Sequence, residues 1–291
     1  MIAIVTDSSA HLCRGEAEAL GVTVVPMTYN LSGQQTYWES YMDENGDYEQ
    51  LVDANMEKLR TSQASYASFM GEFLELIESG ADILCLTISS RLSGTFGNAS
   101  MAARDLAPDR IMVVDSLTTS GGLYQMVREA RRLLDGGMSL SEAAAALTAL
   151  RNCVRIAFTV DDIAPLRRSG RLGVVRLSIS TILNIRPVLR CVEGSIISTG
   201  VVRGRNEQMK TLVDSLPKEP CDCLVEGFMA DEQMVQLKAK VEAKGHRATI
   251  RRIGPVLGIH LGRGCLGVSW IDRSSDPCAA LLDTKDVNSD N

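Results

Sequence analysis

Ser93 stands where an apolar run ends and a helix of small residues is predicted to begin. Residues 83–88 are mainly apolar, and residues 89–95 form a turn rich in Ser and Gly. The first turn of a helix leaves backbone N–H groups unpaired, and its dipole favours a negative charge. The Ser93 hydroxyl and the backbone around Gly94 therefore predict an anion site, with simple helix capping as the alternative.

Two further segments carry hydroxyl or guanidinium groups suited to an anion. Thr61 begins a Thr-Ser-Gln run between two predicted helices, where such residues also serve as caps. Arg171 and Arg203 each lie beside a glycine, which lets the backbone approach a ligand closely. Because arginine can hold carboxylate or phosphate through two parallel hydrogen bonds, both are candidates for contacts with an anionic ligand. The alternative is a solvated charged face.

His260 lies in a segment with five glycines between residues 254 and 267. We expect this segment to be a loop, because glycine adopts backbone angles that other residues avoid. A lone histidine is more often structural than functional. The density of glycine nevertheless favours a site where the imidazole meets a ligand between apolar neighbours.

The composition limits the class of ligand. A net charge of −6 and a pI near 5.2 argue against a nucleic-acid partner. Aromatic residues make up only 4% of the chain while Met occurs 12 times, so a pocket would have aliphatic walls that suit an alkyl chain. The sequence shows no signal peptide and no apolar run of the ~20 residues that span a membrane, so we expect a cytoplasmic protein.

Familiar catalytic and cofactor patterns are missing from the sequence. It contains no Walker loop, no HExxH and no G-x-S-x-G, and its three His have no clustered carboxylates nearby. Residues 262–267 match the dinucleotide fingerprint GxGxxG, but they precede a predicted strand, whereas that fingerprint follows one. We therefore expect no metal, no cofactor and no nucleotide site.

Short apolar runs alternate with helical patterns through the first half of the chain. This alternation predicts an α/β domain with a mostly parallel sheet and helices on both faces. The predicted strands are residues 2–6, 22–31, 83–89 and 111–114, and the predicted helices are residues 48–59, 68–79, 97–106, 120–135 and 141–152.

The second half predicts a smaller α+β domain with a mixed or antiparallel sheet. A tight turn at Glu193-Gly194 joins two of its strands into a hairpin. The predicted strands are residues 154–160, 185–192, 195–202, 223–228, 249–253 and 266–271, with helices at 207–216 and 231–244 and a helix end at 178–184. We divide the chain into lobes at residues 1–153 and 154–280, followed by a polar tail at 281–291.

Nine segments, in order along nearly the whole chain, resemble the DegV family of bacterial fatty-acid-binding proteins. Any one segment alone would be weak evidence. They are TDSSA at 6–10, VVPMTY at 24–29, TSQ at 61–63, TISSRLSGTF at 87–96, VDS at 114–116, VDDIAPLRRSGRL at 160–172, LNIRPVL at 183–189, VVRGR at 201–205 and GPVLGIHLGRGCLG at 254–267.

The resemblance implies a buried channel between two lobes that holds one fatty acid of about 14 to 18 carbons, each buried CH₂ contributing ~0.8 kcal/mol. The family residues that hold the carboxylate match Thr61, Ser93 with its neighbour Gly94, and His260. The resemblance also implies a separate ATP-dependent fatty-acid kinase as partner. The acyl phosphate then enters phospholipid synthesis, with a transient contact at the membrane surface. Arg171 and Arg203 match basic positions that would hold the phosphate or dock the kinase.

The chain departs from the family pattern beside two of these residues. Ala64 stands where TSQ usually continues with proline, and Ile259 and Leu261 replace two hydroxyl residues beside His260. We expect these changes to alter head-group binding or chain preference, and Arg263 adds a charge without an assigned role. The alternative function is a hydrolase or transferase for a small anionic metabolite, with Ser93 as nucleophile. That chemistry needs a base and an orienting carboxylate, and the sequence offers no clear candidate for the carboxylate.

Overall fold

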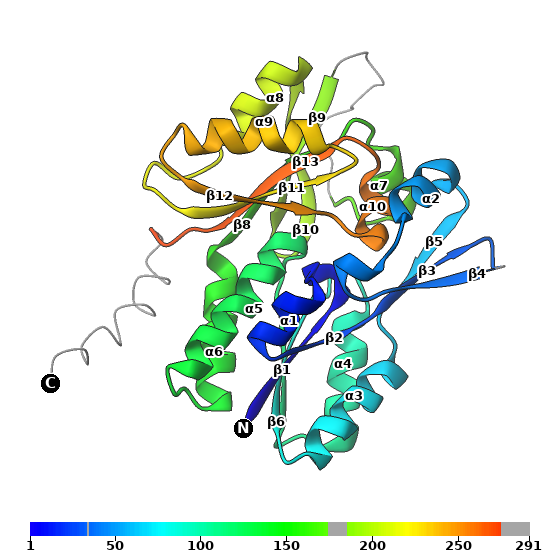
Figure 1. Cartoon of the computed structure of the whole chain (residues 1–291), viewed down its shortest axis with the longest axis vertical. Coiled ribbons are helices and arrows are strands. Elements are labelled where there is room, and N and C mark those ends of the chain that lie inside the picture. The colour runs from blue at the N-terminus through cyan, green and yellow to red at the C-terminus, as the bar shows by residue number, and fades with distance from the viewer. Residues whose placement is uncertain (34, 174–184, 275–291) are drawn as a thin grey trace, which may run out of the picture.

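A four-stranded parallel sheet forms the centre of the first half, as the alternating pattern predicts. The computed structural model describes residues 1–33, 35–173 and 185–274 (Figure 1). The strand order is β2-β1-β6-β7, and every neighbouring pair is parallel. These strands are β1 (Ile2–Asp7), β2 (Val22–Val25), β6 (Asp82–Thr87) and β7 (Ile111–Asp115).

Alternate residues of these strands pack against helices on opposite faces of the sheet. Ile4 belongs to one apolar cluster and Val5 to another, because successive strand side chains point to opposite sides. The helices are α1 (Arg14–Leu20), α5 (Ser120–Asp135) and α6 (Leu140–Leu150) on the Ile4 side, and α3 (Tyr66–Glu78) and α4 (Thr95–Leu106) on the Val5 side. Both faces are thus covered, as predicted.

A small antiparallel sheet, which the sequence pattern did not predict, adjoins this core. The single strand predicted over residues 22–31 is wrong, because β2 and β3 (Met27–Leu31) belong to different sheets. Pro26 separates them and has no N–H with which to continue a ladder. The sheet order is β4-β3-β5, with β4 at Gln35–Glu39 and β5 at Leu59–Ser62. The helix predicted over 48–59 ends early, as α2 (Tyr48–Asn55).

The second half contains a six-stranded mixed sheet, as predicted. Its order is β10-β9-β8-β13-β11-β12, and only the β11–β12 pair is parallel. The hairpin turn at Glu193-Gly194 joins β9 to β10. The strands are β8 (Val154–Thr159), β9 (Ile185–Val192), β10 (Ser195–Arg203), β11 (Asp222–Phe228), β12 (Arg247–Arg252) and β13 (Cys265–Ile271), and α8 (Gly204–Val213) and α9 (Asp231–Glu242) cover one face.

The glycine-rich segment around His260 is largely a helix, so the prediction of a loop is wrong. Helix α10 (Pro255–Leu261) begins with a proline, which is well suited to the first helical position. It ends at Gly262, whose φ of 75° favours glycine. Gly258 serves close packing rather than a turn, since a Cβ there would lie 2.4 Å from Phe228 Cε2. A short helix, α7 (Ala164–Ser169), precedes β9 and was not predicted either.

Some predictions fall on parts of the chain that the structure does not describe. The helix end at 178–184 and the tail at 281–291 lie outside the described residues. The domain boundary between residues 153 and 154 stays a prediction. Within the described ranges, no helix is long and apolar enough to cross a bilayer.

Candidate functional site

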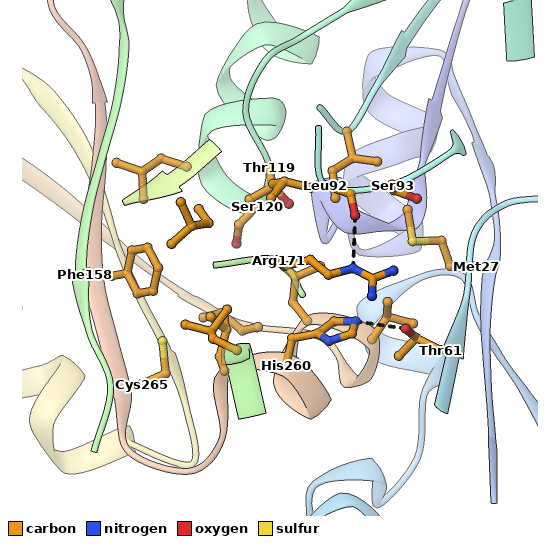
Figure 2. A pocket seen from close by; sticks show the side chains of 18 of the residues that line it. Met27, Thr61, Leu92, Ser93, Thr119, Ser120, Phe158, Arg171, His260 and Cys265 are labelled. Atoms are coloured by element: carbon orange, nitrogen blue, oxygen red, sulfur yellow. Dashed lines mark hydrogen bonds between the residues drawn. The ribbon is translucent and has the colours of Figure 1, made fainter. Parts of the chain in front are cut away.

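A cavity of about 350 Å³ receives side chains from both halves of the chain (Figure 2). Its size lies within the range of small-molecule sites, ~300–1,000 Å³. The apolar side chains that line it are Met27, Ile88, Leu92, Ile156, Phe158, Leu166, Ile196, Ile253, Val256, Leu257, Leu261 and Cys265. The polar ones are Thr61, Ser62, Gln63, Ser93, Thr119, Ser120, Arg171, Glu226 and His260. Such walls combine an aliphatic interior with a few polar groups.

Thr61 and His260 meet at one end of this cavity although 199 residues separate them. Thr61 lies on β5 and His260 in the last turn of α10. The Thr61 Oγ1 and the His260 Nε2 are 2.8 Å apart, within hydrogen-bond distance. The structure therefore brings these two predicted residues into direct contact.

Ser93 lines the same end of the cavity, immediately before α4. Its backbone N–H donates to the Ser89 carbonyl at 3.1 Å, which fixes the turn. Its hydroxyl oxygen lies 2.9 Å from Thr95 Oγ1 and accepts the Thr95 N–H at 3.3 Å. Ser93 thus accepts a hydrogen bond from the first residue of α4 and also presents its hydroxyl at the cavity.

Gly94 is the N-cap of α4 and is exposed beside the cavity rather than lining it. Its lack of a side chain has a local cause. A Cβ at this position would lie 2.2 Å from the Gln63 Oε1, so any other residue would displace the Gln63 side chain from the rim.

His260 is neutral over most of the pH range. Burial is the main cause that lowers the pKa of its imidazole, to about 4, and the Arg171 guanidinium adds repulsion. A neutral imidazole has one donor and one acceptor nitrogen. The Arg171 Nε donates to the Leu92 carbonyl at 3.3 Å, which holds the exposed guanidinium near the imidazole.

Arg203, the other predicted basic residue, does not line the cavity. It is exposed at the end of β10, where its backbone N–H donates to the Glu207 Oε2 at 2.6 Å. Arg263 also lies at the surface, and its Nη1 is 3.4 Å from Asp53 Oδ2 on α2. A surface ion pair of this kind contributes little to stability.

The residues beside His260 that depart from the family pattern add aliphatic surface. Leu261 lines the cavity, and Ile259 is buried in the apolar core. Ala64 is fully buried, and its carbonyl accepts a hydrogen bond from Asn98 Nδ2 at 2.8 Å.

Buried polar groups of the first half hold the N-terminus of α10. The Gly254 N–H donates to His11 Nε2 at 3.1 Å, and the Val256 N–H donates to Glu39 Oε2 at 3.2 Å. Gly254 is required here because a Cβ would lie 1.9 Å from Glu39 Oε1. Burial raises the pKa of Glu39 to about 8 and lowers the pKa of His11 to about 3. The helix that carries His260 is thus positioned from the opposite half of the chain.

Three polar residues of the cavity, Thr119, Ser120 and Glu226, were not predicted from the sequence. Ser120 begins α5 with a φ of 49°, an unusual angle for a residue other than glycine. Glu226 lies within β11, and its Oε1 accepts the Ser120 hydroxyl at 2.5 Å. The available signal was a single charged residue inside the apolar run of residues 223–228.

Within residues 1–33, 35–173 and 185–274, the Ser93 hydroxyl has no catalytic base as a hydrogen-bond partner. In the described part of the chain, its hydroxyl bonds with Thr95, while His260 bonds with Thr61. A nucleophilic serine needs a base within hydrogen-bond reach. The described residues also contain no group of three or more His, Cys, Asp or Glu side chains able to hold a metal ion.

Comparisons with known proteins agree on one family. The family model for DegV, described as an uncharacterised protein family, matches residues 1–273. A DegV domain-containing protein of Deinococcus radiodurans is 31% identical, over 92% of this chain and 97% of its own length. A fatty-acid-binding DegV family structure from Thermus thermophilus has a TM-score of 0.85 at 31% identity, covering 93% of this chain and 99% of its own.

A second solved structure extends the agreement to another organism. It is a stearic-acid-binding protein from Eubacterium ventriosum, with a TM-score of 0.82 at 27% identity, and it covers 94% of this chain and 99% of its own. The matches span almost the full length of both partners in each comparison, so they are not confined to one motif. The chain belongs to the DegV family.

Proposed function

We propose that this protein binds a long-chain fatty acid in the cavity, with the carboxylate at Thr61, Ser93 and His260. The observation that carries the proposal is the convergence of these polar groups at one end of a cavity with otherwise mostly aliphatic walls. The fatty-acid-binding relatives from Thermus thermophilus and Eubacterium ventriosum support the same ligand class.

The chemistry of the polar end suits a carboxylate. A buried carboxylate costs several kcal/mol unless its oxygens accept hydrogen bonds. The two hydroxyls and the neutral imidazole can supply donors, and the exposed Arg171 adds a positive charge at their side. Each CH₂ of a chain of about 14 to 18 carbons would add ~0.8 kcal/mol on burial along the apolar walls.

The polar end also suits a role in which the bound acid is handed to another protein. We propose a separate ATP-dependent fatty-acid kinase in the cytoplasm as that partner. The acyl phosphate that the kinase makes would enter phospholipid synthesis after a transient contact with the membrane surface. Arg171 is exposed beside the head-group residues and would hold the new phosphate. Arg203, outside the cavity, would serve in docking the kinase.

Lipid extraction tests the binding proposal directly. The purified chain is extracted with organic solvent, and mass spectrometry is expected to find fatty acids of about 14 to 18 carbons. Chains of this length are expected because each buried CH₂ contributes ~0.8 kcal/mol to the binding free energy. Ser93→Ala and His260→Ala should each weaken binding of octadecanoic acid about tenfold, because each removes one hydrogen bond to a charged group. Unchanged affinity in both variants would contradict the site, and the absence of lipid under all growth conditions would contradict the function.

A fluorophosphonate probe separates binding from the alternative of serine catalysis. We expect no labelling of Ser93, since Thr95 rather than a base is its partner. Labelling that Ser93→Ala abolishes would favour an enzyme instead.

A further inference from the structure

The cavity contains a second polar region, formed by Ser120 and Glu226, which the carboxylate site does not use. Both residues line the cavity and are buried, with 6% and 5% of their surfaces exposed. Figure 2 shows Ser120 with its hydroxyl directed into the space between Phe158 on one side and Arg171 and His260 on the other. An alkyl chain that fills the cavity from the carboxylate site would therefore pass this region.

The hydrogen bonds of this region fix the direction of its protons. The Gly254 N–H donates to His11 Nε2, so the ring proton of a neutral His11 is on Nδ1. That proton faces Ser120 Oγ at 3.1 Å. Ser120 consequently accepts from His11 and donates its own proton to Glu226 Oε1.

Glu226 is likewise surrounded by donors. Its Oε1 also accepts the Gly121 N–H at 2.7 Å, and its Oε2 accepts the Ser269 hydroxyl at 2.8 Å. A carboxylate has about four acceptor positions, and a hydroxyl oxygen has two. Among the residues that the structure describes, these partners leave one acceptor position open on Glu226 and one on Ser120. Burial raises the pKa of the Glu226 carboxyl, whereas the donors Ser120, Ser269 and Gly121 lower it. In its ionised form, Glu226 offers a ligand an acceptor and no proton.

These open acceptors favour an acyl chain that carries a hydrogen-bond donor. A plain methylene chain laid over them excludes water and returns no hydrogen bond, which is unfavourable for a buried acceptor. A keto oxygen is itself an acceptor and cannot pair with them. A hydroxyl group can donate.

We propose that the preferred ligand is a long-chain acid with a hydroxyl on its chain, which donates its one proton to the open acceptor of Glu226 or of Ser120. This rests on the proposed fatty-acid binding and adds the substituent that this chain selects. The carboxylate site fixes one end of the ligand. The second polar region then contacts the acyl chain at a fixed distance from the carboxylate. The preference therefore depends on hydroxyl position.

A ligand series on the full chain, stripped of lipid, tests this proposal. The probes are octadecanoic acid, monohydroxyoctadecanoic acids with the hydroxyl moved stepwise along the chain, and the corresponding oxo acids, each measured by competition with a fluorescent fatty acid. At least one hydroxy acid is expected to bind about tenfold or more tightly than octadecanoic acid, as one hydrogen bond to a charged acceptor supplies. Its oxo counterpart should gain nothing.

The outcomes distinguish the proposed hydroxyl preference from the proposed fatty-acid binding on which it rests. If octadecanoic acid binds and no hydroxy acid binds more tightly, the hydroxyl preference is overturned while fatty-acid binding stands. If none of the acids binds, both fail.

Glu226→Gln provides a variant readout that structural damage alone would not produce. The amide keeps the size of the side chain but presents N–H donors, so the hydroxyl preference should fall and the oxo acid should gain affinity. Glu129→Gln is the matched control, a buried glutamate on α5 outside the cavity, and it should leave the preference unchanged. If Glu226→Gln does not fold, Ser120→Ala should reduce the preference. A preference that persists in a folded Glu226 or Ser120 variant would overturn the assignment.

Discussion

Successive side chains along each strand of the six-stranded sheet point to opposite faces, and the two faces contact different parts of the molecule. On the outer face, Val225, Leu266 and Val268 pack under α8 and α9 in an apolar cluster. On the inner face, Glu226 and Gly267, their neighbours on the same strands, line the cavity. The outer face is completed by the protein's own helices. The inner face lines the cavity with Glu226 and Gly267 and with apolar side chains such as Ile156 and Phe158.

This difference separates stability from binding along single strands. A side chain on the outer face has a full set of protein neighbours, so its loss leaves a void. An inner-face side chain that lines the cavity has fewer protein neighbours, so its loss should change mainly the fit of a ligand. Substitutions of matched size on the two faces test this division.

The largest effect is expected from Leu266→Ala on the outer face. Leu266 is fully buried, so the variant should lower the free energy of unfolding by about 2–5 kcal/mol. Ile156→Ala on the inner face removes a similar volume but should cost less stability and weaken octadecanoic acid binding instead. Urea denaturation of the lipid-free proteins and a competition assay measure the two effects. A larger stability loss for Ile156→Ala, with binding unchanged, would contradict the division.

The next effect is the pH dependence of stability that comes from Glu39 and His11, the buried residues that bind the N-terminus of α10. Burial raises the pKa of Glu39 from 4.5 to about 8, so the folded state holds this proton more tightly than the unfolded state. Stability from this group is full below pH 4.5 and is lost as the pH rises towards 8. His11 acts in the opposite direction, because burial lowers its pKa from 6.5 to about 3 and stability falls as the medium is acidified below 6.5.

Glu39→Gln should remove only the loss on the alkaline side. Between pH 5 and 8, the free energy of unfolding should fall less in the variant than in the wild type, by at most ~1.4 kcal/mol per pH unit. Denaturant titrations at each pH measure the difference. Parallel curves for the two proteins would show that Glu39 does not titrate as a buried carboxyl.

Filling the cavity should shift chain-length preference by a smaller amount. Ile196→Phe adds volume to the inner face, so octadecanoic acid should lose affinity relative to tetradecanoic acid by about fourfold for each displaced CH₂, from ~0.8 kcal/mol. Val268→Phe on the outer face is the control, which should destabilise the fold without changing the preference. An equal change of chain-length preference in both variants would contradict the assignment of ligand binding to the inner face alone.

The smallest effect is expected from Arg171→Gln. Its guanidinium is exposed, so the variant should weaken octadecanoic acid binding by less than about fivefold, from ~0.2–1 kcal/mol, and the difference should vanish in 1 M salt. Arg203→Gln should have no effect on acyl affinity, since Arg203 lies outside the cavity. Equal effects from both arginines would place the head group closer to Arg203 than the geometry indicates.

Local pattern was sufficient for much of the fold. The helix at 120–135 and the strand at 185–192 have the predicted bounds, because each has a long periodic run with clear ends. The errors arose where one residue type has two uses. Glycine at 258 allows close helix packing rather than a loop, and Pro26 divides an apolar run that otherwise resembles one strand.

The candidate site was less accessible to local reasoning. Thr61, Ser93 and His260 were grouped by family resemblance, since no periodicity links β5 to α10 across 199 residues. Glu226 was missed because its partner, Ser120, lies 106 residues away. A charged residue in an apolar strand signals a buried partner, but only the packing of the two halves identifies it.

The position of α10 near the end of the described chain sets an order of events during synthesis. The ribosome completes the parallel sheet and exposes Ser93 long before residue 260 is made. At that stage, Glu39 and His11 have no helix to hold, and the imidazole that pairs with Thr61 does not exist. If the proposed carboxylate site needs all three groups, it can form only after the second half has docked, so occupancy of the cavity would mark a chain whose two halves have come together.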